Sequence, residues 1–262
     1  MIVIVGAGKM GEALLAGLLR AGWAKPEEIA LAEPVEARRV ELAAKYPGVH
    51  VAEHPVAADG AIIAVKPAIV PEAAAALGAV GVGRVLSIAA GVATSTIEAS
   101  LPANTPVVRA MPNTPALVGA GAAAIAPGKA ATDGDVAWAE SILSAVGVVV
   151  RVPEDELDAV TGLSGSGPAY VFLVAEAMIA AGTAVGLSPE VAERLAIQTI
   201  MGAGRMLAES GQSPEDLRAA VSSPNGTTVA GLGVLDDRGV RDAFSAAIAR
   251  ATERSRELGR GE

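Results

Sequence analysis

The chain begins Met1-Ile2-Val3-Ile4-Val5-Gly6-Ala7-Gly8-Lys9-Met10-Gly11, and this stretch decides how the remaining sequence is interpreted. A β-branched run is followed at once by the pattern G-x-G-x-x-G, which opens an apolar helical pattern. In that context Gly6 permits a tight turn, Gly8 lets the backbone approach a pyrophosphate, and Gly11 lets helix and strand pack closely. The stretch predicts a dinucleotide-binding turn formed by Gly6, Ala7, Gly8, Lys9, Met10 and Gly11. The alternative is a glycine-rich turn without a ligand.

Glu33 ends the second apolar run, 22 residues after Gly11. An acid at that position binds the ribose 2′-hydroxyl and repels a 2′-phosphate, which favours NADH. Arg38 and Arg39 follow closely, and they either reach such a phosphate or form the solvated face of a helix. We therefore expect NADPH or NADH as the cofactor, with Glu33 at the ribose.

Short apolar runs alternate with helical patterns up to about residue 150. The runs predicted as strands are 2–5, 29–33, 61–65, 84–89, 106–109, 121–126 and 146–152, with helices over 11–21 and 34–45 between the first of them. Strands that are apolar throughout are typical of a sheet covered on both faces. Alternation with helices therefore predicts an α/β fold, with an N-terminal Rossmann-type, doubly wound parallel sheet.

The strand pattern stops after Val152, where Pro153 is followed by three acids that suit the first turn of a helix. Farther on, Ser188-Pro189-Glu190 and Ser213-Pro214-Glu215 each combine an N-cap serine, a proline at the first helical position and an early acid. The sequence thus predicts a dinucleotide-binding domain over 1–152 and an all-α domain over 153–262.

The helix expected from Pro168 is apolar on nearly all sides and rich in small residues. One of its faces carries Val171, Val174, Met178, Ala181 and Val185. A helix of this kind is usually buried. Within a piece of about 110 residues, this favours burial by a second subunit over burial in an ordinary core.

Composition excludes several classes of protein. The 262 residues include no cysteine, so disulfide scaffolds and thiolate metal sites are excluded. A net charge of −9 and 2% aromatic residues disfavour binding to nucleic acid or to an anionic membrane. The longest uncharged run, 110–128, contains Pro112, Pro115 and Pro127 and is a poor membrane span. No charged leader precedes the first strand, so we expect a cytoplasmic protein.

Several further segments have a specific order and spacing. They are Ala64-Val65-Lys66-Pro67, Ser87-Ile88-Ala89-Ala90-Gly91, Arg109-Ala110-Met111-Pro112-Asn113-Thr114-Pro115, the block 158–170, and Val221-Ser222-Ser223-Pro224-Asn225-Gly226-Thr227-Thr228. Together they resemble pyrroline-5-carboxylate reductase from Ile4 to about Leu258. The resemblance implies hydride transfer from the nicotinamide to the imine carbon of Δ1-pyrroline-5-carboxylate, which gives L-proline. It also implies that the helical domain is a dimerisation domain, in a homodimer or a ring of dimers.

The resemblance further implies roles for particular residues. Backbone groups of two strand ends contact the cofactor, namely those of Ala64, Val65, Lys66, Pro67, Ile88, Ala89 and Ala90. The loop before a late helix holds the substrate carboxylate through Ser223, Gly226, Thr227 and Thr228, with Thr228 as the catalytic residue. Glu154 lines the substrate pocket near the ring nitrogen. These roles suit the chemistry, because nicotinamides lie at the carboxyl edge of parallel sheets and helix starts bind anions. The structural alternatives are a solvated Lys66, a plain capping box at the loop, and a first-turn acid at Glu154.

The remaining polar residues suggest no other chemistry. His50 and His54 have no recognisable partner and are expected at the surface, and Tyr170 is expected to pack. An imine whose nitrogen is already protonated needs mainly positioning, so the lack of a dedicated acid is tolerable. The alternatives are a related reductase for another cyclic imine or a β-hydroxyacid, and a non-catalytic dinucleotide-binding regulator.

Overall fold

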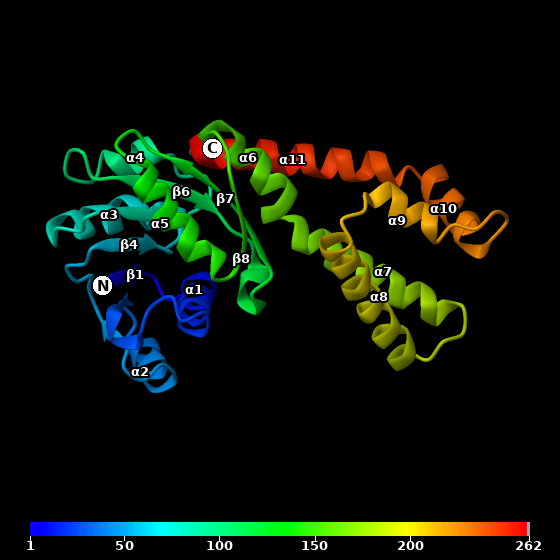
Figure 1. Ribbon diagram of the computed structural model, residues 1–262, viewed down its shortest axis with the longest axis horizontal. Coiled ribbons are helices and arrows are strands. Elements are labelled where there is room, and N and C mark those ends of the chain that lie inside the picture. The colour runs from blue at the N-terminus through cyan, green and yellow to red at the C-terminus, as the bar shows by residue number, and fades with distance from the viewer. Residues whose placement is uncertain (261–262) are drawn as a thin grey trace. The chain divides into compact units, whose positions relative to one another are not determined.

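A computed structural model describes residues 1–260 of the chain, which form two compact units (Figure 1). The first unit holds Met1–Ser166 together with the last helix from Ala249 onward, and the second holds Gly167–Ile248. The division therefore differs from the expected one between 152 and 153. Residues 153–166 belong to the first unit, because Leu157 is fully buried against Ala124 and Ala126 of the sheet.

The first unit is built on an eight-stranded sheet in the order β3-β2-β1-β4-β5-β6-β7-β8. Its strands are β1 Ile2–Val5, β2 Ile29–Ala32, β3 His50–Ala52, β4 Gly60–Ile63, β5 Val85–Ser87, β6 Val107–Met111, β7 Gly121–Pro127 and β8 Gly147–Arg151. Seven of them match expected runs. No expected run corresponds to β3, whose three residues are all exposed or half-buried.

One pairing departs from the expected parallel sheet: β6 and β7 are antiparallel. The connection 112–120 contains only a 3₁₀ turn at Thr114–Val118. A parallel pairing needs a crossover of about a dozen residues or more, usually a helix, so this short connection reverses the chain. Every other neighbouring pair in the sheet is parallel.

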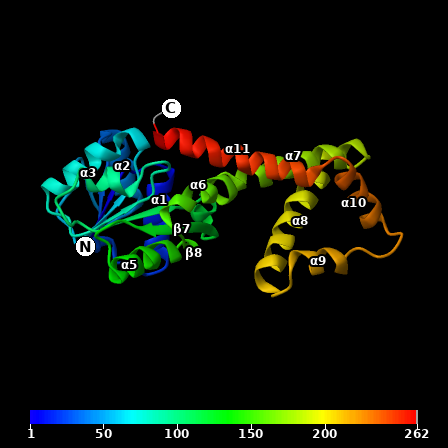
Figure 2. The same ribbon diagram turned by 90° about the horizontal axis from the view of Figure 1, so that it is seen from above.

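Helices cover both faces of the sheet, as a doubly wound fold requires. They are α1 Lys9–Arg20, α2 Glu36–Lys45, α3 Val70–Ala79, α4 Thr94–Glu98, α5 Asp133–Ser144 and α6 Leu157–Val160. Successive β1 residues point to opposite faces. Ile2 and Ile4 join a core with α1 and α5, whereas Val3 and Val5 join a core with α3 and α4. Figure 2 shows α3 and α5 on opposite sides of the strands.

The second unit is entirely helical, as expected. It contains α7 Gly167–Ala184, α8 Pro189–Glu209, α9 Pro214–Ala220 and α10 Thr227–Asp237, and α11 Val240–Arg260 begins in it. Both expected N-caps form: Ser188 Oγ accepts from the Val191 N–H at 3.4 Å, and Ser213 Oγ accepts from the Asp216 N–H at 3.1 Å.

The helical unit has almost no core of its own. Among residues 167–248, the buried apolar side chains are those of Ala192 and Ala196. Gly182 lets α8 approach α7, because a Cβ at Gly182 would lie 3.2 Å from the Ala192 Cβ. On the other faces, Phe172 is 61% exposed and Leu173 is 64% exposed. Continuous apolar surface of this kind marks a protein-interaction site.

The stretch Glu154–Ala184 is, by length and composition, long and apolar enough to cross a membrane, with a mean hydropathy of 1.4. It is not one regular helix. A 3₁₀ turn at Glu154–Glu156 and a π-helical segment at Thr161–Gly165 flank α6. Its first half packs on the sheet through Leu157, whereas α7 carries most of the exposed apolar side chains of this stretch and Leu163 adds one before it.

Glu12 joins α1 to α2 through three donors. Its carboxylate accepts from Lys45 Nζ at 2.7 Å, from the Tyr46 hydroxyl at 2.9 Å, and from Arg38. Burial raises the pKa of Glu12, but these hydrogen bonds outweigh that effect and lower the pKa from 4.5 to about 2.

We predict that Glu12→Gln lowers the free energy of unfolding by about 1–3 kcal/mol at neutral pH. Because the folded pKa lies below the unfolded value, this stabilisation is complete above about pH 4.5 and is lost as the pH falls toward 2. Urea unfolding of both proteins at several pH values measures the difference. Glu72→Gln, at an exposed position in α3, is the control. A difference that does not shrink in acid would contradict the assignment.

Candidate dinucleotide and anion sites

The turn between β1 and α1 is shaped by its three glycines, each in a different way. Gly6 has φ 97°, and a Cβ there would lie 2.8 Å from the Ala64 carbonyl oxygen. A Cβ at Gly11 would overlap the Gly6 carbonyl oxygen. Gly8 has no atom within 4 Å of the position a Cβ would take. Gly6 and Gly11 are therefore needed by the fold, whereas Gly8 leaves open space over the backbone.

The start of α1 presents unpaired backbone donors beside that space. Gly8 is the N-cap residue and provides no side-chain cap, and the first intrahelical bond is from the Glu12 N–H to the Gly8 carbonyl. The N–H groups of Lys9, Met10 and Gly11 thus have no partner within the helix. Such donors, at the positive end of the helix dipole, fit the phosphates of a dinucleotide.

Glu33 lies next to this turn, as expected from its place after β2. Its two carboxylate oxygens accept from the Ala7 N–H at 3.2 Å and from the Val35 N–H at 3.0 Å. A carboxylate offers about four lone-pair positions, so capacity remains for a ribose hydroxyl. The geometry therefore suits the ribose role that the sequence analysis assigned to Glu33.

Arg38 is held by acids at the glycine turn. Its guanidinium pairs with Glu12 and, at 2.5 Å, with Glu41, and it donates to the Ala7 carbonyl at 3.3 Å. Its charge is therefore already balanced. Arg38 is therefore not part of a purely solvated helix face.

Arg39 is also engaged, beside Glu33. It donates to the backbone carbonyls of Glu33 at 3.0 Å and Pro34 at 2.7 Å, and it lies 3.6 Å from Glu53. The arginine thus supports the chain segment that carries the Glu33 carboxylate.

The ends of β4 and β5 complete one edge of the sheet. The Ala64 N–H donates to the Val5 carbonyl at 2.8 Å, and the Ile88 N–H donates to the Ile63 carbonyl at 3.0 Å. Since β1, β4 and β5 are neighbours, the structure brings together the residues expected to bind cofactor, namely 6–11, Glu33, Ala64–Pro67 and Ile88–Ala90. Lys66 follows the end of β4, is exposed, and directly precedes a 3₁₀ turn.

Glu154 is anchored within the first unit. Its oxygens accept from the Thr94 N–H and the Thr94 hydroxyl, both at 2.7 Å, and from Arg109 at 3.3 Å. Burial raises the pKa of Glu154, but these donors outweigh it and leave the pKa below 4.5. The carboxylate is therefore ionised at neutral pH. The sequence does not indicate Thr94 and Arg109 as partners of Glu154, because they are 60 and 45 residues away along the chain.

The loop 221–226 of the second unit turns sharply before α10. The Gly226 N–H donates to the Ser223 carbonyl at 2.9 Å, with Pro224 and Asn225 between them, and Asn225 has φ 60°. Proline followed by a residue with positive φ is the pattern of a type II turn. A Cβ at Gly226 would lie 2.9 Å from the Ser223 carbonyl oxygen, so the turn favours glycine there.

The helix that follows this turn has no side-chain cap. Gly226 is the N-cap of α10 and cannot provide one. The capping box considered above is therefore absent, since the residue three positions on is Val229. The N–H groups of Thr227, Thr228 and Val229 lack partners within the helix and lie on exposed residues. The helix start is thus open to a carboxylate.

The three other polar candidates lie where expected. His50 and His54 are exposed. The Tyr170 ring packs edge-on against Phe244, with ring centroids 6.5 Å apart.

Comparisons with known proteins cover both units. The family model described as pyrroline-5-carboxylate reductase dimerisation matches residues 154–258, and one described as NADP oxidoreductase, coenzyme F420-dependent, matches 1–91. Pyrroline-5-carboxylate reductases of Methanosarcina acetivorans and of Synechocystis are each 44% identical to this chain. The first alignment covers 99% of this chain and 98% of the relative, and the second covers 98% and 97%.

Solved structures agree. A pyrroline-5-carboxylate reductase of Coxiella burnetii superposes with a TM-score of 0.92 at 37% identity, over 98% of this chain and 97% of that one. Plasmodium falciparum pyrroline carboxylate reductase with NADP bound superposes with a TM-score of 0.85 at 28% identity, over the same shares of the two chains.

The glycine turn yields a paired prediction. Gly8→Ala should leave the free energy of unfolding within about 0.5 kcal/mol of the original, because the added methyl meets nothing, yet should weaken dinucleotide binding at least tenfold. Gly11→Ala should lower that free energy by about 2–4 kcal/mol, because its methyl overlaps the Gly6 carbonyl. Urea unfolding and cofactor titration measure the two effects. Equal losses of stability in both variants would show that the turn is purely structural.

Proposed function

The chain belongs to the pyrroline-5-carboxylate reductase family, and on that premise we propose which of its residues hold the two reactants. The enzyme is an NAD(P)H-dependent oxidoreductase that reduces Δ1-pyrroline-5-carboxylate to L-proline, the last step of proline biosynthesis. Bound NADH or NADPH supplies the hydride that the imine carbon accepts. The uncapped start of α10 is the observation that carries the assignment of the substrate site.

The cofactor is proposed to lie along the carboxyl edge of β1, β4 and β5. The N–H groups at 8–11 bind its pyrophosphate, Glu33 accepts from the ribose, and the backbones of Ala64–Pro67 and Ile88–Ala90 contact the nicotinamide end. Three features of the first unit support this: the open space over Gly8, the unpaired N–H groups of α1, and the position of Glu33 beside Ala7.

The substrate carboxylate is proposed to lie at the start of α10. The N–H groups of Thr227 and Thr228 donate to it, and the hydroxyls of Ser223 and Thr228 complete the contact. Gly226 keeps this helix start free of a competing side-chain cap. Thr228 is the proposed catalytic residue, because its backbone and hydroxyl both fix the ring for attack. Positioning is the main requirement, since an imine nitrogen that arrives protonated needs no further acid.

Glu154 is proposed as the acid near the ring nitrogen. Thr94 and Arg109 keep it ionised, and a carboxylate stabilises a nearby iminium cation. Arg109 balances part of its charge, so the effect on the ring is one of orientation and modest attraction.

The helical unit is a dimerisation domain, and we propose that it forms a homodimer, which could further assemble as a ring of dimers. An apolar groove between α7 and α8 is lined in part by Val171, Phe172, Ile179, Ile197 and Met201. The unit buries only two alanines by itself, so a second copy is needed to cover these side chains. In such a dimer the substrate loop of one subunit can serve the cofactor domain of another.

We also propose that the enzyme works in the cytoplasm.

The cofactor assignment is tested with Glu33→Ser. The original enzyme should oxidise both NADH and NADPH when pyrroline-5-carboxylate is added, as followed by loss of reduced-nicotinamide absorbance. The variant should raise the ratio of kcat/KM for NADPH to kcat/KM for NADH at least tenfold, because a carboxylate no longer repels the 2′-phosphate. Glu36→Ser, at an exposed position in α2, is the matched control. An unchanged ratio would refute the ribose role of Glu33.

The substrate assignment is tested with Thr228→Ala. We expect the KM for pyrroline-5-carboxylate to rise at least tenfold, while the KM for NADH or NADPH changes less than twofold. Thr105→Ala, in an exposed turn of the first unit, should change neither value. Equal losses for substrate and cofactor would mean that the loop has a structural role only.

A further inference from the structure

The end of α11 belongs to the first unit and packs there through one face of the helix. Thr252, Ser255 and Gly259 form this face, since residues three and four apart lie on the same side of a helix. Thr252 and Ser255 are both buried. The Ser255 hydroxyl donates to Asp158 Oδ1 of α6 at 2.6 Å. This hydrogen bond holds the end of α11 against the segment that follows β8.

One turn beyond Ser255, the helix meets the loop 88–93, which joins β5 to α4. Gly91 in this loop has φ 73°. A Cβ at Gly259 would lie 3.0 Å from the Gly91 carbonyl oxygen, and a Cβ at Gly91 would lie 3.5 Å from the Gly259 backbone nitrogen. The two backbones therefore pack directly on each other. A side chain at Gly259 would push the Gly91 carbonyl, and the loop with it, out of place.

The same loop is also held where it enters α4. The Thr94 N–H and the Thr94 hydroxyl donate to the two oxygens of Glu154, both at 2.7 Å. Glu154 and Asp158 are four residues apart in one short segment. That segment thus supports the loop at two points: directly at Thr94, and at Gly91 through the end of α11.

The first half of this loop is the stretch Ile88–Ala90, which is proposed above to contact the nicotinamide end of the cofactor. The Ile88 N–H donates to the Ile63 carbonyl at 3.0 Å, so the loop is fixed at its start as well. A loop held at its start, middle and end presents its backbone in one arrangement. Cofactor binding then does not have to order it, which improves affinity.

We propose that Ser255 and Gly259 are positioning residues for the reductase reaction. The end of α11 sets the path of the loop 88–93 and thereby the place of the nicotinamide. This inference rests on the proposed cofactor contacts of Ile88–Ala90. Ser255 and Gly259 act through the backbone at Gly91, so their loss should weaken the cofactor and spare pyrroline-5-carboxylate.

The first test separates cofactor from substrate. Ser255→Ala and Gly259→Val should each raise the Kd for NADPH and for NADH about fivefold or more, as measured by nicotinamide fluorescence without substrate. The KM for each cofactor should rise in parallel, while the KM for pyrroline-5-carboxylate changes less than about twofold. Asp158→Asn keeps the oxygen that accepts from Ser255, so its cofactor Kd should stay within about twofold of the original. A fall in kcat with an unchanged cofactor Kd in both variants would overturn the proposal.

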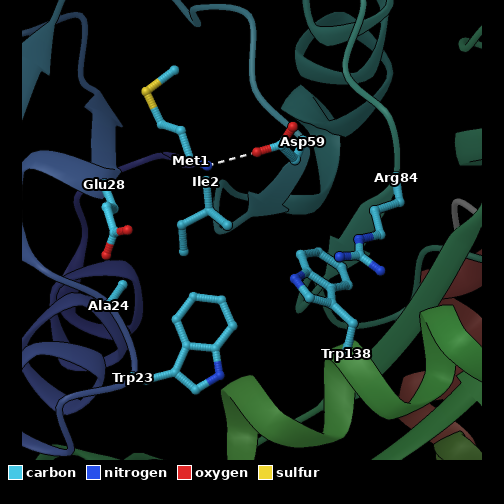
Figure 3. Close-up of a pocket in the computed structure, with 8 residues that line it drawn as sticks. All are labelled: Met1, Ile2, Trp23, Ala24, Glu28, Asp59, Arg84 and Trp138. Carbon is cyan, nitrogen blue, oxygen red and sulfur yellow. Dashed lines mark hydrogen bonds and ion pairs between the residues drawn. The ribbon is translucent and has the colours of Figure 1, made fainter.

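The matched control lies at the amino edge of the sheet, where Figure 3 shows Trp23 and Arg84 beside a cavity. Arg84 directly precedes β5, whereas the loop 88–93 follows that strand. Trp23 Nε1 donates to Ser141 Oγ at 3.0 Å. Ser141→Ala therefore also removes one hydrogen bond between distant segments, but at the opposite edge. It should leave the cofactor Kd within about twofold of the original. A rise equal to that in Ser255→Ala would reveal a general effect of stability and refute the positioning role.

Hydrogen–deuterium exchange of the amides at 88–93 tests the loop itself. Without cofactor, Ser255→Ala should speed this exchange about fivefold or more. In the original enzyme, added NADPH should slow it. Slowing by NADPH with unchanged exchange in Ser255→Ala would refute the support from α11 alone. Faster exchange in the variant with no slowing by NADPH would refute the proposed cofactor contacts and, with them, the positioning role.

Discussion

Close approach of backbone to backbone at the turn between β1 and α1 is the constraint on which the rest of the structure depends. Gly6 adopts a positive φ beneath the end of β4, and Gly11 sits directly against the Gly6 carbonyl. Any side chain at either position would push α1 away from the sheet. Only with α1 so close do its first N–H groups point over the carboxyl edge, where Gly8 leaves room for a ligand. One tight turn thus sets both the packing of the first core and the place proposed for the cofactor.

Acidic side chains organise the surroundings of that turn. The Glu12 carboxylate accepts hydrogen bonds from Arg38, Lys45 and the Tyr46 hydroxyl, and these contacts hold α2 against α1. Glu33 receives backbone N–H groups on both oxygens. The Glu154 carboxylate accepts hydrogen bonds from Thr94 and Arg109, and these bonds hold the segment after β8 against the sheet. In a chain with a net charge of −9, these carboxylates are stabilised by specific donors and are not merely a solvated surface.

The helical unit is organised by a different rule. Its helices present apolar side chains that the unit itself does not cover, and its buried apolar residues are two alanines. In the proposed homodimer such a unit gains most of its hydrophobic stabilisation from the second copy. The same unit carries the turn Ser223–Gly226 that opens α10. The proposed substrate site therefore lies on the same set of helices as the surface proposed for self-association.

The sequence by itself determined the alternation of strands and helices, the glycine turn, the acid after β2, the capped helices at Ser188 and Ser213, and the family. These are local signals, because each depends on residues within a turn or two of one another. Only the tertiary structure decided which distant groups meet. It paired Arg38 with Glu12 and Glu154 with Thr94, reversed β7 against β6, added the short edge strand β3, and returned the end of α11 to the first unit. Those outcomes depend on contacts between side chains that are tens of residues apart and on the length of the connections. Long-range contacts and connection lengths leave no periodic pattern along the chain, so the sequence pattern does not predict them.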